Sequence, residues 1–177
     1  QTCALPLGLS CTGRKGVLHV DIKIYGRPAH AGSRHQDGRS ALRELAHQIV
    51  ALESLTDYER GITVNVGLAS GGSFINVVPA EAEAKVCIRA PEPEQLEALR
   101  EHVLALQPED VDVKLEITAE VNRPVFPRLE GTAELFKHAR ELCRTIGFSL
   151  EERHSGGGSH ARFTAALRLP TLAPPSP

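Results

Sequence analysis

A glycine-rich turn near the end of the chain, Ser155-Gly156-Gly157-Gly158-Ser159, precedes a short apolar segment with helical character. The first backbone N–H groups of a helix have no partner within the helix, so a turn of this kind can hold a carboxylate or an oxyanion. The same composition is also typical of a flexible linker. The turn is therefore a candidate anion site, with Gly156, Gly157, Gly158 and Ser159 as its binding residues.

A histidine lies among small residues in the segment Gly26-Arg27-Pro28-Ala29-His30-Ala31-Gly32. The small neighbours leave the imidazole of His30 accessible and allow the loop to approach another surface closely. Considered alone, the segment favours an ordinary exposed histidine.

Two further residues are candidates for contact with an anionic ligand: Asn76, in Asn76-Val77-Val78-Pro79, and Arg89, in Cys87-Ile88-Arg89-Ala90-Pro91. A planar guanidinium suits a carboxylate because it donates two parallel hydrogen bonds. Each residue also has a structural interpretation. Arg89 can pair with Glu81 or Glu83 on the polar face of a strand, and Asn76 can satisfy its own backbone in a turn.

In this order, the four segments resemble the zinc-dependent family of aminoacylases, glutamate carboxypeptidases and succinyl-diaminopimelate desuccinylases, over roughly residues 14–172. The resemblance implies a catalytic domain with two zinc ions that is interrupted by a smaller lid domain, which commonly forms the dimer interface. It implies that His30 is catalytic and stabilises the tetrahedral intermediate in a partner subunit's active site. It also implies that the substrate's carboxylate is contacted by Asn76, Arg89, Gly156, Gly157, Gly158 and Ser159.

The chain departs from the family in its metal chemistry. The upstream zinc ligands and general base have no counterpart, and His160 stands where the family usually has an acidic residue. Among eight histidines, His30 with His35 and His154 with His160 have spacings expected by chance, whereas a catalytic zinc needs three convergent ligands. The four cysteines form no C-x-x-C pair and are expected to be reduced. We therefore expect no metal and no other cofactor in this chain, although two zinc ions are implied for the intact family enzyme.

Period-two alternation predicts four strands, around residues 18–24, 62–68, 82–88 and 111–119. Helical periodicity predicts helices over 41–52 and 96–106. The order β-α-β-β-α-β predicts an α+β fold: a ferredoxin-like two-layer sandwich with a four-stranded antiparallel sheet and both helices on one face. We assign residues 14–121 to this lid or dimerisation domain and residues 1–13 to an unmatched N-terminal segment.

Residues 122–177 have a different pattern. A helix over 135–146, a strand at 148–150, the glycine-rich turn, a helix through 163–167 and a strand at 171–172 are expected. Strands that alternate with helices indicate a parallel sheet, but two short strands cannot form one buried on both faces. We therefore expect an incomplete α/β segment, the C-terminal fragment of a catalytic domain with an unmatched proline-rich tail. Both ends suggest a truncated product or a piece of a longer protein.

Charge and edge geometry indicate the partners. Twenty Lys and Arg against 22 Asp and Glu give no broad basic field, so neither nucleic acid nor an anionic membrane is expected as a partner. The second strand, residues 62–68, lies at the sheet edge in this topology. Its outward residues Thr63, Asn65 and Gly67 carry neither charge nor proline, which predicts a homodimer through this strand.

The first hypothesis for function is the lid region of a cytoplasmic zinc-dependent amidohydrolase or peptidase. The intact enzyme would cleave an amide next to a free carboxylate, and the isolated chain would be inactive. The alternative is a non-enzymatic dimerisation or small-molecule-binding module, because a ferredoxin-like fold does not fix function.

Overall fold

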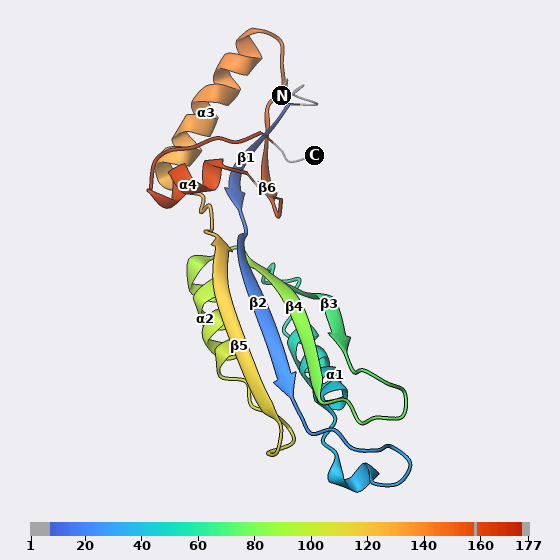
Figure 1. Ribbon diagram of the computed structural model, residues 1–177. Helices are drawn as coiled ribbons and strands as arrows, with labels where there is room; N and C mark the ends of the chain where they lie inside the picture. The colour runs from blue at the N-terminus through green and yellow to red at the C-terminus, as the bar shows by residue number, and fades with distance from the viewer. Residues whose placement is uncertain (1–7, 158, 175–177) are drawn as a thin grey trace. The chain divides into compact units, whose positions relative to one another are not determined.

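The computed structural model describes residues 8–157 and 159–174 (Figure 1). Its elements follow in the order β1 (Leu9–Arg14), β2 (Gly16–Tyr25), the short 3-10 helix η1 (His35–Asp37), α1 (Ala41–Glu53), β3 (Thr63–Gly71), β4 (Glu81–Ala90), α2 (Pro93–Leu104), β5 (Lys114–Arg123), α3 (Glu130–Thr145), β6 (Glu151–Ser155) and α4 (Ala161–Ala166).

Strands β2 to β5 form a four-stranded antiparallel sheet in the order β3-β4-β2-β5. With α1 and α2 they give the predicted β-α-β-β-α-β sandwich (Figure 1). The predicted alternation in β2 is confirmed, because Leu18, Val20 and Ile22 are at most 1% exposed while His19 between them is exposed. Leu52 of α1 and Val103 of α2 are equally buried, so the apolar face of the sheet meets the apolar stripes of the two helices.

The last strand of the sheet begins later than the alternation predicts. Val111 is 92% exposed, and β5 begins at Lys114. The buried carboxylate of Glu44 accepts hydrogen bonds from the backbone N–H groups of Glu109 (3.2 Å) and Asp110 (3.3 Å). These bonds hold residues 109–110 in a turn, so the strand geometry starts only after it.

A second, two-stranded sheet pairs β1 with β6 in parallel, from Leu9 beside Glu151 to Arg14 beside Ser155. Strand β1 was not predicted, and β6 lies at 151–155 where a strand at 148–150 was expected. The predicted strand at 171–172 is not formed; the neighbouring Ala173 makes a single bridge to Cys11. Five of the six residues of β1 are buried, so it shows none of the alternation that identifies a half-buried strand.

Two compact units make up the chain. The lid unit comprises residues 18–88 and 97–121, and the second unit comprises the described parts of residues 1–17, 89–96 and 122–177. The second unit has its own small core of Cys11, Phe126, Ala165 and Ala173. Within residues 8–157 and 159–174, no helix is both long enough and apolar enough to cross a membrane.

The second unit contains an ion pair whose contribution depends on pH. Arg128 and Thr12 both donate hydrogen bonds to the carboxylate of Glu152, at 2.5 and 2.6 Å. The bond from Arg128, followed by that from Thr12, lowers the pKa of Glu152 below its ordinary value of 4.5. A lowered carboxyl pKa contributes stability above the ordinary carboxyl range, and that contribution is lost as the pH falls through the folded-state pKa.

We expect Glu152→Gln to lower the melting temperature by a few degrees at pH 7, and to have a progressively smaller effect as the pH is lowered through the acid range and the wild-type carboxyl becomes neutral as well. Scanning calorimetry at pH 7 and at a series of lower pH values measures the difference. Glu151→Gln is the matched control, because Glu151 is its exposed neighbour. A loss for Glu152→Gln that is the same at every pH would show that the ion pair is not its cause.

Candidate functional site

His30 lies on the loop of residues 26–40, between β2 and α1, and this loop is paired with the segment that carries Asn76. The N–H of Ala31 donates to the carbonyl of Asn76, and the N–H of Val78 donates to the carbonyl of Ala29, both at 2.9 Å. His30 and Val77 thereby form an isolated antiparallel bridge. The structure thus brings together two of the predicted site residues, His30 and Asn76, which are 46 positions apart in the chain.

The backbone fixes the imidazole of His30. Its Nδ1 accepts hydrogen bonds from the N–H of Gly32 (3.1 Å) and of Ser33 (3.3 Å). A nitrogen that accepts cannot carry the proton, so the neutral ring holds its proton on Nε2. Because His30 is exposed, this Nε2–H is available as a hydrogen-bond donor to another molecule.

A cavity of about 810 Å³ lies beside His30. Its wall contains Asp37 and three arginines to which no role was assigned from the sequence: Arg27, Arg34 and Arg39. Arg34 pairs with Asp37 at 2.6 Å and Arg39 pairs with Asp112 at 2.8 Å, so both charges are partly neutralised. The hollow beside His30 is therefore polar and rich in hydrogen-bond donors, and suits a ligand with carbonyl or carboxylate oxygens.

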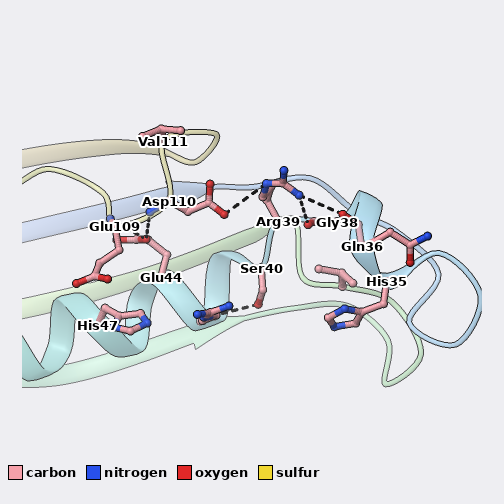
Figure 2. Close-up of a pocket in the computed structure, with 12 residues that line it drawn as sticks. His35, Gln36, Gly38, Arg39, Ser40, Glu44, His47, Glu109, Asp110 and Val111 are labelled. Carbon is pink, nitrogen blue, oxygen red and sulfur yellow. Dashed lines mark hydrogen bonds and ion pairs between the residues drawn. The ribbon is translucent and has the colours of Figure 1, made fainter.

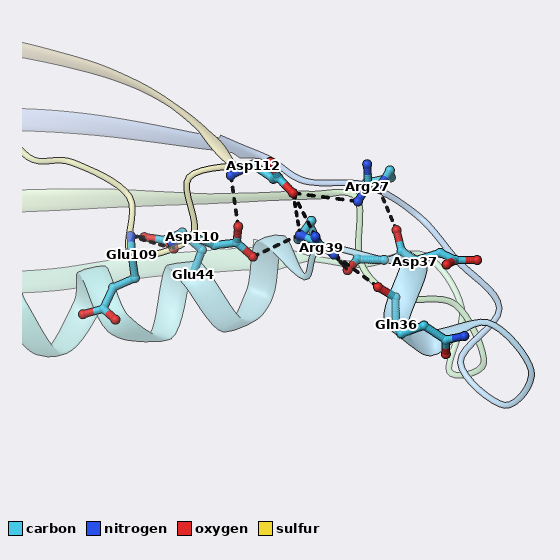
Figure 3. Close-up of polar contacts among 9 residues, drawn as sticks. Arg27, Gln36, Asp37, Arg39, Glu44, Glu109, Asp110 and Asp112 are labelled. Atoms are coloured by element: carbon cyan, nitrogen blue, oxygen red, sulfur yellow. Dashed lines mark hydrogen bonds and ion pairs between the residues drawn. The ribbon is translucent and has the colours of Figure 1, made fainter.

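Arg39 closes the base of the His30 loop. Its backbone exchanges two hydrogen bonds of 2.9 Å with Arg27. Its side chain reaches Asp110 and Asp112, and also the carbonyls of Gln36 and Gly38 (Figure 3).

A second cavity, of about 690 Å³, lies on the α1 side of Arg39 (Figure 2). Glu44, which is 2% exposed, is its buried acid. Besides the two N–H groups of the 109–110 turn, this carboxylate accepts a hydrogen bond of 2.8 Å from Gln48. Its hydrogen-bonding capacity is used within the fold, so we interpret Glu44 as structural and the cavity as shaped by it.

The glycine-rich turn and Arg89 meet within the second unit. Arg89 Nη1 donates to the carbonyl of Gly156 at 2.7 Å, rather than pairing with Glu81 or Glu83. The carbonyl of Gly157 accepts from Arg14 at 3.0 Å and also from Arg162. In this structure the carbonyls of the turn face arginines. Ser159 accepts a hydrogen bond from the N–H of Ala161 at 3.3 Å, and Gly158 lies outside the described residues.

Arg162 was missed by the sequence analysis, because a single arginine in an apolar segment gives no periodic signal. It is fully buried, and its Nε and Nη1 have no partner among residues 8–157 and 159–174. Burial lowers the pKa of Arg162, and repulsion by Arg14, Arg89 and Arg123 lowers it further. Four arginines thus share one small region, and an anion there would satisfy the two unused donors of Arg162.

Comparison with known protein families assigns this lid to a family. A model of the peptidase dimerisation domain matches residues 12–109, more than half of the chain. The chain belongs to the peptidase dimerisation domain family. The domain occurs in amidohydrolases and carboxypeptidases, so the predicted family and lid fold are confirmed.

Similar proteins and a solved structure agree with this assignment. The chain is 27% identical to carboxypeptidase G2 of a Pseudomonas strain over 90% of its own length and 39% of the relative's. It is 30% identical to an uncharacterized protein of Bacillus subtilis, over 86% of the chain and 42% of that protein. A tripeptidase from Staphylococcus aureus has the same fold with a TM-score of 0.81 and 27% identity, over 94% of the chain and 44% of the tripeptidase. The chain thus spans about two fifths of the length of these relatives.

Gly26 tests how tightly the base of the His30 loop is built. A Cβ atom at this position would lie 2.1 Å from the carbonyl oxygen of Arg39. Because backbone must move to relieve this clash, we expect Gly26→Ala to destabilise the chain by about 1–3 kcal/mol in urea unfolding. Gly32→Ala is the matched control in the same loop, since its Cβ would lie 3.5 Å from His30 Cε1, an ordinary contact. Equal stability of the two variants would contradict the tight closure at Gly26.

Proposed function

We propose that this chain is the lid of a zinc-dependent amidohydrolase or peptidase that cleaves an amide next to a free carboxylate, as a homodimer. The observation that carries the proposal is the His30 loop. It presents an imidazole N–H donor in a fixed tautomer, next to Asn76 and a hollow lined by arginines. Two similar proteins are a carboxypeptidase and a tripeptidase by name, which supports an amide substrate with a free carboxylate end.

The proposed role of His30 is to donate its Nε2–H to the oxyanion that forms when a nucleophile adds to the amide carbonyl. A donor held in place before the reaction stabilises that charge without reorganisation. The two backbone N–H groups on Nδ1 keep the proton on Nε2, where the oxyanion would accept it. Asn76, on the adjoining segment, is proposed to contact the substrate.

Arg89, Gly156, Gly157, Gly158 and Ser159 are proposed to hold the substrate's carboxylate. Support comes from the charge of the second unit, where Arg89 approaches Gly156 and Arg162 keeps unused donors. A carboxylate that displaced the glycine carbonyls would give these guanidinium groups charged acceptors, which bind more strongly than neutral ones.

The residues present do not fit a zinc site. No group of three His, Cys, Asp or Glu side chains that could hold a metal ion occurs in the described part of the chain. We therefore propose that zinc is held by a further part of the intact protein, and we derive no step through it.

A chimera tests the catalytic role of His30. Residues 14–121 would replace the matching lid of carboxypeptidase G2, whose own remaining part would supply the rest of the enzyme. We expect His30→Ala in this chimera to lower kcat about 100-fold, the typical effect of removing one oxyanion donor. His19→Ala, an exposed histidine of β2, is the matched control. An active chimera that is insensitive to His30→Ala would contradict the catalytic role of His30.

The proposed dimer contact is the free edge of β3, within residues 62–68, but the structure shows that part of this edge is occupied. Thr56 accepts from the N–H of Val64 at 3.1 Å, and Glu53 accepts from the N–H of Val66 at 2.6 Å. Two of the edge donors that the sequence analysis left open are therefore satisfied within the chain. Beyond them Leu68 is 65% exposed, so we propose that pairing starts at this end of the strand.

We expect the wild-type chain to sediment as a dimer at tens of micromolar, a concentration at which a stable interface of about 1,600 Å² persists. Leu68→Lys, at the exposed end of the strand, places like charges close together in two paired copies of β3, so it should weaken dimerisation about tenfold. Thr118→Lys, at an exposed position of the opposite edge strand β5, is the matched control. A monomeric wild type, or equal effects of the two lysines, would rule out the β3 edge.

A further inference from the structure

The loop that carries His30 contains no hydrophobic anchor. None of residues 26–40 is buried, and its only regular structure is the three-residue η1 turn. A segment without buried apolar side chains must be ordered by polar contacts, or it samples many conformations. The contacts at the two ends of the loop therefore decide how well His30 is placed.

Arg39 makes most of the side-chain contacts at the base of this loop. Its Nη1 donates to the carbonyls of Gly38 (2.9 Å) and Gln36 (3.2 Å), which belong to the loop itself. Its Nε and Nη2 reach Oδ2 of Asp112 at 3.0 and 2.8 Å, and Nε lies 3.4 Å from Oδ2 of Asp110. These two aspartates belong to the turn before β5, so Arg39 connects the His30 loop to a different part of the lid (Figure 3).

The same two aspartates lie next to a rigid point of the lid. Glu44 of α1 holds the N–H groups of Glu109 and Asp110, and the N–H of Asp112 donates to Oδ1 of Asp110 at 3.0 Å. Arg27 adds a second link, because its Nε donates to the carbonyl of Asp37 at 2.6 Å and its Nη2 lies 3.9 Å from Asp112. The path from Glu44 through the 109–112 turn to Arg39 is thus continuous.

We propose that Arg39, held by Asp110 and Asp112, is the positioning residue of His30. Arg39 does not touch the imidazole. It closes the loop so that Gly32 and Ser33 can present their N–H groups to Nδ1 of His30. The closed loop also keeps the hydrogen bond from Ala31 to the carbonyl of Asn76 and the one from Val78 to the carbonyl of Ala29. Only a guanidinium can do this, because it offers five donors in one plane to two carbonyls and two carboxylates, whereas a lysine offers a single ammonium.

The test uses the chain itself and does not require hydrolysis, although the meaning of the result for catalysis rests on the proposed function. In ¹⁵N NMR at about pH 8, above the ordinary histidine range, wild-type His30 should show an unprotonated Nδ1 and a protonated Nε2. In Arg39→Lys, the two ¹⁵N shifts should move toward each other. The amides of Ala31 and Val78 should exchange at least about ten times faster, while those of β2 keep their rates.

Arg43→Lys is the matched control, because Arg43 lines the cavity on the other side of Arg39 and its guanidinium makes no hydrogen bond or ion pair with the described residues. An unchanged tautomer of His30 and unchanged amide exchange in folded Arg39→Lys would overturn the proposal.

Asp112→Asn removes the negative charge that pairs with Arg39 at nearly constant side-chain volume. It should shift the same ¹⁵N and amide signals in the same direction, even if Arg39→Lys fails to fold. The two proposals can fail separately. If the NMR signals of His30 depend on Arg39 but the activity of the chimera does not depend on His30, Arg39 still positions His30 and only the catalytic role is refuted.

Discussion

The structure of this lid depends on one constraint: an exposed imidazole cannot be fixed by burial. His30 is exposed, and no residue of its loop is buried. Hydrogen bonds replace hydrophobic packing here. The 76–78 backbone pairs with the loop near His30, and the Arg27 and Arg39 backbones pair at its base. The close approach of Gly26 to Arg39 and the carboxylates around the Arg39 side chain follow from the same requirement.

Two buried charged residues, Glu44 and Arg162, differ in how far their hydrogen-bonding groups are satisfied within the fold. Glu44 accepts hydrogen bonds from Gln48 and from two backbone N–H groups, so its burial is compensated and its effect is to hold a turn. Arg162 is equally buried but has unused donors among the described residues and cationic neighbours. An uncompensated buried cation is costly. A fold retains such a group most easily where an anion can complete it, which is the reason for proposing that the second unit binds a carboxylate.

The edge of β3 illustrates how a sheet can be both protected and open to pairing. An unpaired strand edge is a template for another strand. Side chains from the end of α1 and the residue Thr56 satisfy the first part of this edge, whereas the part near Leu68 is left exposed. Partial occupation restricts the register in which a second copy can pair, because only the remaining donors and acceptors are available.

The sequence by itself determined the lid, because each of its strands has one wet face and each helix one apolar stripe, and these periods are local properties. It also indicated His30, Asn76 and Arg89 through their flanking residues. It did not reveal β1, whose burial removes the alternation and whose partner β6 lies more than 130 residues away. Nor did it reveal that Val111 lies in a turn, that Arg39 closes the His30 loop, or that Arg162 is buried among arginines. Each of these depends on contacts between residues distant in the chain, and the tertiary structure alone decides which of those residues meet.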